Sequence, residues 1–313
     1  MAEKAVARET LFVLRETIAR LEGRPVPALA AAAGEPGAQG FSEGDMPPLP
    51  IGIAAVDEAL EGGLRRDALT EVRSQGLRDA GAATGFALAL AACLREGEEA
   101  APLLWIGDTV AGLEAGLPYG VGLKGFGVDP KGFLLAAPRK LDEALWLAET
   151  ALAGAAFAAV VLEVRGNPAR FGLTESRRLA LRAKAAGRPL LLLRQAGEEE
   201  ASSACHRLCA EPAPAPARPL PDGSLLGGSI GNPAFRITLE KSRNPAPLSF
   251  VLEWNAHDRR FFPVLGQPDR RFPAAAGVHP AHSGARLSAS ADRPDRAEDM
   301  GAVLAFGARR RPA

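Results

Sequence analysis

The sequence lacks the features of secreted and membrane proteins. Its three cysteines, Cys93, Cys205 and Cys209, are too few for a disulfide framework. It has no uninterrupted apolar run of about 18 residues, so we expect no membrane span. The N-terminal residues alternate charged and apolar groups and do not contain the apolar segment of a secretion signal. We therefore expect a cytoplasmic protein.

Net charge and a recognisable metal site are also missing. Lys and Arg together number 37, as do Asp and Glu, so the overall charge does not favour nucleic acid, although a local basic patch stays open. Cys205, His206 and Cys209 form a C-H-x-x-C group, but structural zinc needs four ligands and no second pair stands at finger spacing. We predict no metal, and a short helix over Glu198 to Cys209 with a solvated acidic start.

The composition divides the chain into four parts. Residues 1–24 are predicted to form an amphipathic helix, 25–48 an Ala/Gly/Pro-rich linker, 49–262 a globular core, and 263–313 a largely disordered tail. A short helix with a single apolar stripe is marginal alone in water, so this one must bury its stripe on its own core or on another protein. We predict a contact with another protein through the stripe, which consists of Leu11, Leu14, Ile18 and Leu21.

Within the core, apolar strands alternate with helices. Strands that are apolar throughout and separated by helices are typical of a parallel sheet covered on both faces. Two later segments alternate apolar and polar residues, which predicts an antiparallel hairpin at one sheet edge: Phe235–Glu240 and Ser249–Trp254. The predicted helices are Ala54–Glu61, Leu141–Ala153 and Thr174–Ala186. The predicted parallel strands are Leu69–Arg73, Leu103–Gly107, Phe133–Ala137, Ala158–Val164 and Leu190–Leu193.

The stretch after the first strand has the glycine frame of a nucleotide phosphate loop without its charge. Gly76 and Gly81 enclose four residues at the start of an Ala/Leu helix, as in a P-loop. The next two positions, Lys and Ser/Thr in a P-loop, are Ala82 and Ala83, which cannot contact a γ-phosphate with positive charge or ligate magnesium. Thr84 offers a hydroxyl one residue late. We therefore predict no catalytic residue and no nucleotide cofactor.

The residues before this loop resemble the opening of RecA-type proteins, through Ile51-Gly52, Val56-Asp57, Leu60 and Gly62-Gly63-Leu64. Among RecA-like proteins the chain is similar to the ImuA family over residues 51–254. The segments that carry this similarity are ATGFALALAACL, RKLDEALWLAETAL, TESRRLALRAKAAGRPLLLLR and LEKSRNPAPLSFVLEW.

The resemblance implies a RecA-like three-layer sandwich and an accessory role in SOS-induced, error-prone translesion DNA synthesis. The ImuA family acts with ImuB, a Y-family polymerase homologue, and with an error-prone replicative-type polymerase. It therefore implies association with the nucleoid upon DNA damage. RecA, a second copy of the chain and single-stranded DNA stay open as further contacts.

The resemblance also assigns candidate residues. In RecA-like ATPases an acidic residue ends the strand that faces magnesium, a place held here by Glu163, and Asp108 lies near the position of the water-activating carboxylate. Without the lysine, two carboxylates would repel a triphosphate, so we interpret both as vestigial. Arg165 and Arg170 border the loop that faces DNA in RecA-like proteins and are candidate phosphate contacts, although a solvated basic face is the simpler interpretation.

Two alternative functions stay open from the sequence. The chain could be an active RecA-like ATPase or recombinase paralogue whose phosphate-binding lysine comes from elsewhere, with Lys124 or Lys140 as candidates. It could also be a cell-division inhibitor that caps a tubulin-like polymer, although that class is usually much shorter. Nucleotide binding discriminates the first alternative from a non-catalytic accessory protein.

The first prediction concerns the N-terminal stripe. Deleting residues 1–24 should reduce pull-down of the polymerase partner and leave the melting temperature unchanged, because the stripe is predicted to be buried on that partner. Both quantities are measured on the full chain and on the truncated chain. Unchanged pull-down together with a strongly lowered melting temperature would place the stripe in the protein's own core.

Overall fold

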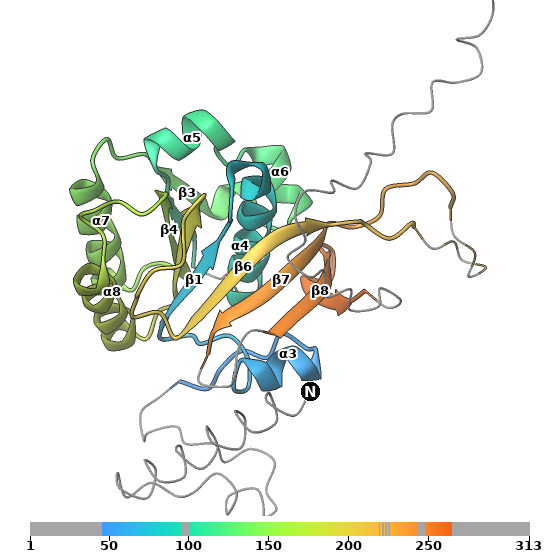
Figure 1. Ribbon diagram of the computed structural model, residues 1–313, viewed down its shortest axis with the longest axis horizontal. Helices are drawn as coiled ribbons and strands as arrows, with labels where there is room; N and C mark the ends of the chain where they lie inside the picture. Colours follow the sequence, from blue (N-terminus) through green and yellow to red (C-terminus); the bar gives the residue numbers. More distant parts are fainter. Residues whose placement is uncertain are drawn as a thin grey trace, which may run out of the picture. The chain divides into compact units, whose positions relative to one another are not determined.

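The computed structural model describes residues 46–95, 101–218, 220, 222, 224, 226–242 and 248–264. Within these ranges the chain forms one nine-stranded sheet in the order β3-β2-β4-β5-β1-β6-β7-β8-β9 (Figure 1). The strands are β1 Leu69–Arg73, β2 Leu103–Ile106, β3 Phe133–Ala136, β4 Ala159–Arg165, β5 Leu190–Gln195, β6 His206–Ala213, β7 Ala234–Lys241, β8 Leu248–Asn255 and β9 Arg260–Pro263. The helices are α3 Ala54–Ala59, α4 Ala80–Leu94, α5 Thr109–Ala115, α6 Gly120–Gly125, α7 Leu141–Gly154 and α8 Leu173–Ala186, with short 3₁₀ turns η1 Leu77–Asp79 and η2 Pro130–Gly132.

The fold class predicted from the sequence is confirmed. Strands β3, β2, β4, β5, β1 and β6 are mutually parallel, and β7 and β8 pair antiparallel. Apart from the helix predicted over Glu198 to Cys209, the strands and helices predicted within the described residues lie within two residues of the observed ones. The helix and linker predicted before Met46 and the tail predicted after Val264 lie outside the described residues.

The prediction of a helix over Glu198 to Cys209 is wrong. The chain from Ala196 to Cys205 is irregular, and β6 begins at His206, pairs parallel with β1 and continues to Ala213. Helical spacing of Cys205 and Cys209 suggested the helix, but the first five residues of β6 are all buried, as expected for a strand inside the sheet. The two cysteines are therefore about 13 Å apart along an extended chain.

The antiparallel hairpin is present, but it is not the edge of the sheet. β9, which the sequence did not predict, pairs antiparallel with β8 and forms the edge. It has only four residues, and Phe261 alone among them is buried. A four-residue strand with one buried side chain has too short an alternation of apolar and polar residues to be recognised in the sequence.

Two apolar cores fill the layers on either side of the sheet. Figure 1 shows α7 and α8 on one face, with α4 against the other. α4 is apolar all round, because the sheet, α3 and the turn before β9 enclose it. Leu77–Leu94 is the single helical stretch of the described chain long and apolar enough to cross a membrane, and 67% of it is buried inside the fold.

The segment that resembles RecA-type openings has a structural role here. The Asp57 carboxylate accepts hydrogen bonds from the backbone of Ile51 (2.6 Å) and Gly52 (3.0 Å), which fixes the approach to α3. After α3, Gly62 and Gly63 have φ angles of +105° and +126°. A Cβ at Gly63 would lie 2.2 Å from the Leu49 oxygen, so this close approach requires glycine.

A cluster of buried charges joins the middle of the sheet. Glu71 of β1 is fully buried, and its two oxygens contact Arg194 Nε (3.1 Å) on β5 and Arg207 Nε (3.2 Å) on β6. Ser202 Oγ also donates to Glu71, at 2.6 Å. The cluster therefore connects three neighbouring strands and holds the Ala196–Cys205 segment over this face of the sheet.

We predict that Glu71→Gln lowers the free energy of unfolding by about 3–5 kcal/mol, because two buried guanidinium groups lose their common counter-charge. Urea unfolding of both proteins measures the change. The matched control is Asp142→Asn, which breaks the exposed Asp142–Arg170 pair and should cost less than about 1 kcal/mol. Equal effects of the two substitutions would contradict a structural role for the cluster.

Candidate functional site

The loop between β1 and α4 occupies the place of a phosphate loop but is closed on itself. Residues 77–79 form the 3₁₀ turn η1, in which the Asp79 amide donates to the Gly76 oxygen at 3.0 Å. The Ala80 amide donates to the Leu77 oxygen. A phosphate is held by backbone amides that point at it from a glycine loop and a helix N-terminus. The amides of Asp79 and Ala80 instead donate hydrogen bonds to carbonyl oxygens within the turn.

The two alanines that replace Lys and Ser/Thr lie in the first turn of α4. Ala83 is fully buried in the apolar core, and Ala82 is partly buried against it. Thr84 is adjacent, and its Oγ1 accepts a hydrogen bond from Gln195 Nε2 at 2.8 Å. The Thr84 hydroxyl, one residue after the Ser/Thr position of a P-loop, is therefore already hydrogen-bonded to Gln195.

A chain of buried polar groups continues from Gln195 across the carboxyl ends of the strands. Gln195 Nε2 donates to Glu163 Oε1 at 3.1 Å, and Trp105 Nε1 donates to Glu163 Oε2 at 3.1 Å. On the other side, Ser74 Oγ donates to Gln195 Oε1 at 3.2 Å and accepts from the Ala196 amide at 2.9 Å. The polar groups of this network are thus paired with one another.

The sequence analysis missed Ser74, Trp105 and Gln195 as members of this network. Ser74 follows the end of β1, Gln195 is the last residue of β5, and Trp105 lies within β2, inside a run that is otherwise apolar. A polar residue at the carboxyl end of a buried strand is a recognisable signal. The indole of Trp105 gives no such signal, because tryptophan is also a common core residue.

Burial raises the pKa of Glu163, and hydrogen bonds from Gln195 and Trp105 oppose this effect, while the negative charge of Asp108 adds to it. Asp108 has a separate structural role. Its Oδ1 accepts from the amides of Val110 (2.8 Å) and Ala111 (2.9 Å), so it caps the N-terminus of α5. Both acids have partners within the protein.

The arginines proposed to contact DNA are engaged in surface ion pairs. Arg165 Nε donates to Glu114 Oε2 at 2.6 Å, which lowers the pKa of Glu114, and Arg170 Nη1 lies 3.0 Å from Asp142 Oδ2. The arginine side chains are 37% and 76% exposed. Exposed pairs of this kind are weak and can exchange with a phosphate.

The Arg165–Arg170 loop is joined to the segment that follows β5. The Glu198 amide donates to Asn167 Oδ1 at 2.7 Å, and Asn167 Nδ2 donates to Glu200 Oε2 at 2.9 Å. The Glu198–Glu200 triplet, predicted as a helix start, therefore lies in irregular chain beside the Arg165–Arg170 loop. Its three carboxylates reduce the positive potential there.

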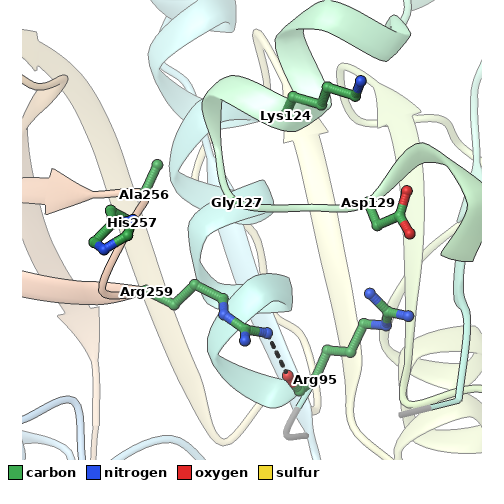
Figure 2. Close-up of a pocket in the computed structure, with 7 residues that line it drawn as sticks. All are labelled: Arg95, Lys124, Gly127, Asp129, Ala256, His257 and Arg259. Carbon is green, nitrogen blue, oxygen red and sulfur yellow. Dashed lines mark hydrogen bonds between the residues drawn. The ribbon is translucent and has the colours of Figure 1, made fainter. Parts of the chain in front are cut away.

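The candidate lysines for an alternative phosphate site lie on elements other than the β1–α4 loop. Lys124 of α6 lines a cavity of about 570 Å³, which Arg95, just after the C-terminus of α4, also lines (Figure 2). In that cavity Arg259 Nη1 donates to the Arg95 oxygen at 3.4 Å, a favourable place for a cation at a helix C-terminus. Lys140 precedes α7 after β3, four strand positions or about 19 Å from β1.

Cys205, His206 and Cys209 do not form a metal site. The Cys205 thiol lies 3.2 Å from the Leu69 oxygen, and burial raises the pKa of the Cys209 thiol to about 12. Among the residues with described positions, no group of three or more His, Cys, Asp or Glu side chains is placed to hold a metal ion.

Comparison with known proteins gives a distant structural similarity. No family model and no curated protein matches the sequence. Among solved structures, the crystal structure of the RadB recombinase is similar, with a TM-score of 0.45 and 16% identity over 69% of this chain and 99% of that chain. Similarity of this size carries no inference about activity, so the functional argument depends on the geometry of the site.

We predict that pH reveals the buried Glu163. Because its folded pKa is raised above the ordinary value of 4.5, the folded state binds more protons than the unfolded state above that pH. The contribution of Glu163 to stability is present below pH 4.5 and is lost as the pH rises through the folded pKa.

The measurement is the melting temperature of the wild type minus that of Glu163→Gln, followed from about pH 4 to pH 8. The difference should fall as the pH rises and level off above the folded pKa. A difference that rises with pH would mean that hydrogen bonds from Gln195 and Trp105 outweigh burial.

Proposed function

We propose that this chain is a non-catalytic RecA-like accessory protein of SOS-induced, error-prone translesion DNA synthesis, similar to the ImuA family. In this role it recruits or organises an ImuB-like Y-family polymerase homologue and an error-prone replicative-type polymerase at damaged DNA. The family resemblance of residues 51–254 supports the pathway, and the RecA-like sheet is consistent with it.

The observation that supports the non-catalytic role is that the polar groups in and beside the β1–α4 loop are hydrogen-bonded to one another. Its amides form a 3₁₀ turn, and Thr84, Glu163 and Gln195 bind one another. A nucleotide would have to break this network without gaining a lysine or a magnesium ligand in return. The protein surface, rather than bound nucleotide, would then carry the function.

The main alternative is an active ATPase paralogue, and the position of Lys140 weighs against it. Lys140 follows β3, which lies four strand positions or about 19 Å from β1 across the sheet. A cell-division inhibitor remains the weaker alternative, with no observation here that favours it. Contacts with RecA, with single-stranded DNA or with a second copy are compatible with the accessory role.

We predict no measurable ATP binding. Calorimetric titration of the full chain with Mg–ATP should give only the heat of dilution, since the positive charge and the magnesium ligand of a P-loop are missing. A dissociation constant in the low micromolar range would overturn the non-catalytic proposal.

A genetic test separates the accessory role from ATPase activity. A host that lacks the gene is complemented with the wild type or with Glu163→Gln, after the variant is shown to fold. Damage-induced mutation frequency should be restored by both, because Glu163 has no catalytic role. Restoration by the wild type alone favours the ATPase alternative, and restoration by neither removes the translesion role.

A further inference from the structure

Asp79 is a buried acid whose hydrogen bonding is incomplete. Its side chain is 6% exposed, and its enclosed Oδ2 atom accepts no hydrogen bond from the described part of the chain. Arg78 Nε lies 3.5 Å from Oδ2, too far for a hydrogen bond of normal strength, and the Arg78 side chain is 79% exposed. By contrast, both oxygens of Glu71 and of Glu163 have partners.

Asp79 lines a cavity of about 350 Å³ beside the closed phosphate loop. The cavity is lined by Arg78, Asp79, Glu211, Pro212 and Arg236. It lies at the carboxyl ends of β1 and β6, the edge at which open α/β sheets bind their ligands. Glu211 and Arg236 face each other across β6 and β7, so their opposite charges compensate. Among the residues that line the cavity, Asp79 then has only the exposed Arg78 as a nearby positive charge.

We propose that this cavity, the Asp79 pocket, receives an arginine or lysine side chain of the partner protein. The proposal rests on the accessory function and names the chemistry of one contact. A buried carboxylate with a free acceptor position fits a guanidinium or ammonium group, which would form a short charge-assisted hydrogen bond. An anionic phosphate would be repelled by Asp79, since the charge of Glu211 is compensated by Arg236. The Asp79 pocket would thus bind a cation, whereas a phosphate loop binds an anion.

Arg78 would move aside when the partner binds. It contacts Asp79 only at 3.5 Å, and its side chain is mostly in water, so displacing it costs little. It occupies part of the same cavity and repels an incoming cation. Removing Arg78 should therefore strengthen cation binding, whereas removing the Asp79 charge should abolish it.

The test uses the full chain and ethylguanidinium chloride as the probe, followed by the NMR shifts of backbone amides around Asp79, Glu211 and Arg236. N-ethylurea, a neutral molecule of similar shape, is the ligand control. We expect a saturable shift with the cation alone, weakened about tenfold or more in Asp79→Asn and strengthened in Arg78→Ala. Asp142→Asn, at an exposed acid, should leave the affinity unchanged.

Two results would overturn the inference. One is the absence of a localised shift in both the wild type and Arg78→Ala, which would mean that water alone satisfies Asp79. The other is a shift of equal size in the wild type and a folded Asp79→Asn. If Asp79→Asn does not fold, the strengthening in Arg78→Ala still decides the question. Neither result bears on the mutation-frequency test, so failure of the pocket and failure of the accessory function are distinguishable.

Discussion

The carboxylate of Glu71 is the interaction on which the centre of the fold depends. It lies in β1, between β5 and β6, and each neighbour supplies one arginine to it. A buried ion cluster is weak evidence for stability in itself, because desolvation offsets much of the attraction. The cluster matters here because it fixes the positions of neighbouring strands and of the segment between β5 and β6. The arginines also bind the backbone at Gly166 and Glu200, so loss of one carboxylate would release both the sheet centre and the segment between β5 and β6.

This arrangement explains which parts of the fold could be predicted from the sequence. The parallel strands β1 to β5 are apolar runs between helices, and their periodicity is enough to locate them. β6 was missed because His206 and Arg207 interrupt the apolar pattern. Both are buried, and Arg207 is tolerated inside the sheet because Glu71 lies on the adjacent strand. A pairing of residues 136 positions apart leaves no local signal.

The candidate site likewise has features that can be predicted from the sequence and features that cannot. Loss of the lysine and the hydroxyl at Ala82 and Ala83 is visible in the sequence, and it indicated an altered phosphate loop. The replacement is visible only in three dimensions, where Gln195 of β5 bridges Thr84 of α4 and Glu163 of β4. Asp79 was likewise overlooked, because an acid at a helix start is normally a solvated cap. It lines its cavity together with Glu211 and Pro212 of β6, a strand that was not predicted from the sequence.

The enclosure of α4 has a consequence for synthesis of the chain. This helix is complete at Leu94, but its core partners include Phe235, Trp254 and Phe261, which are made at least 140 residues later. Until they emerge, a helix apolar on every side lacks part of its cover, and incomplete domains with exposed apolar surface tend to aggregate. Fragments that end before β9 should therefore be insoluble, and the short edge strand marks the point at which the nascent domain becomes self-sufficient.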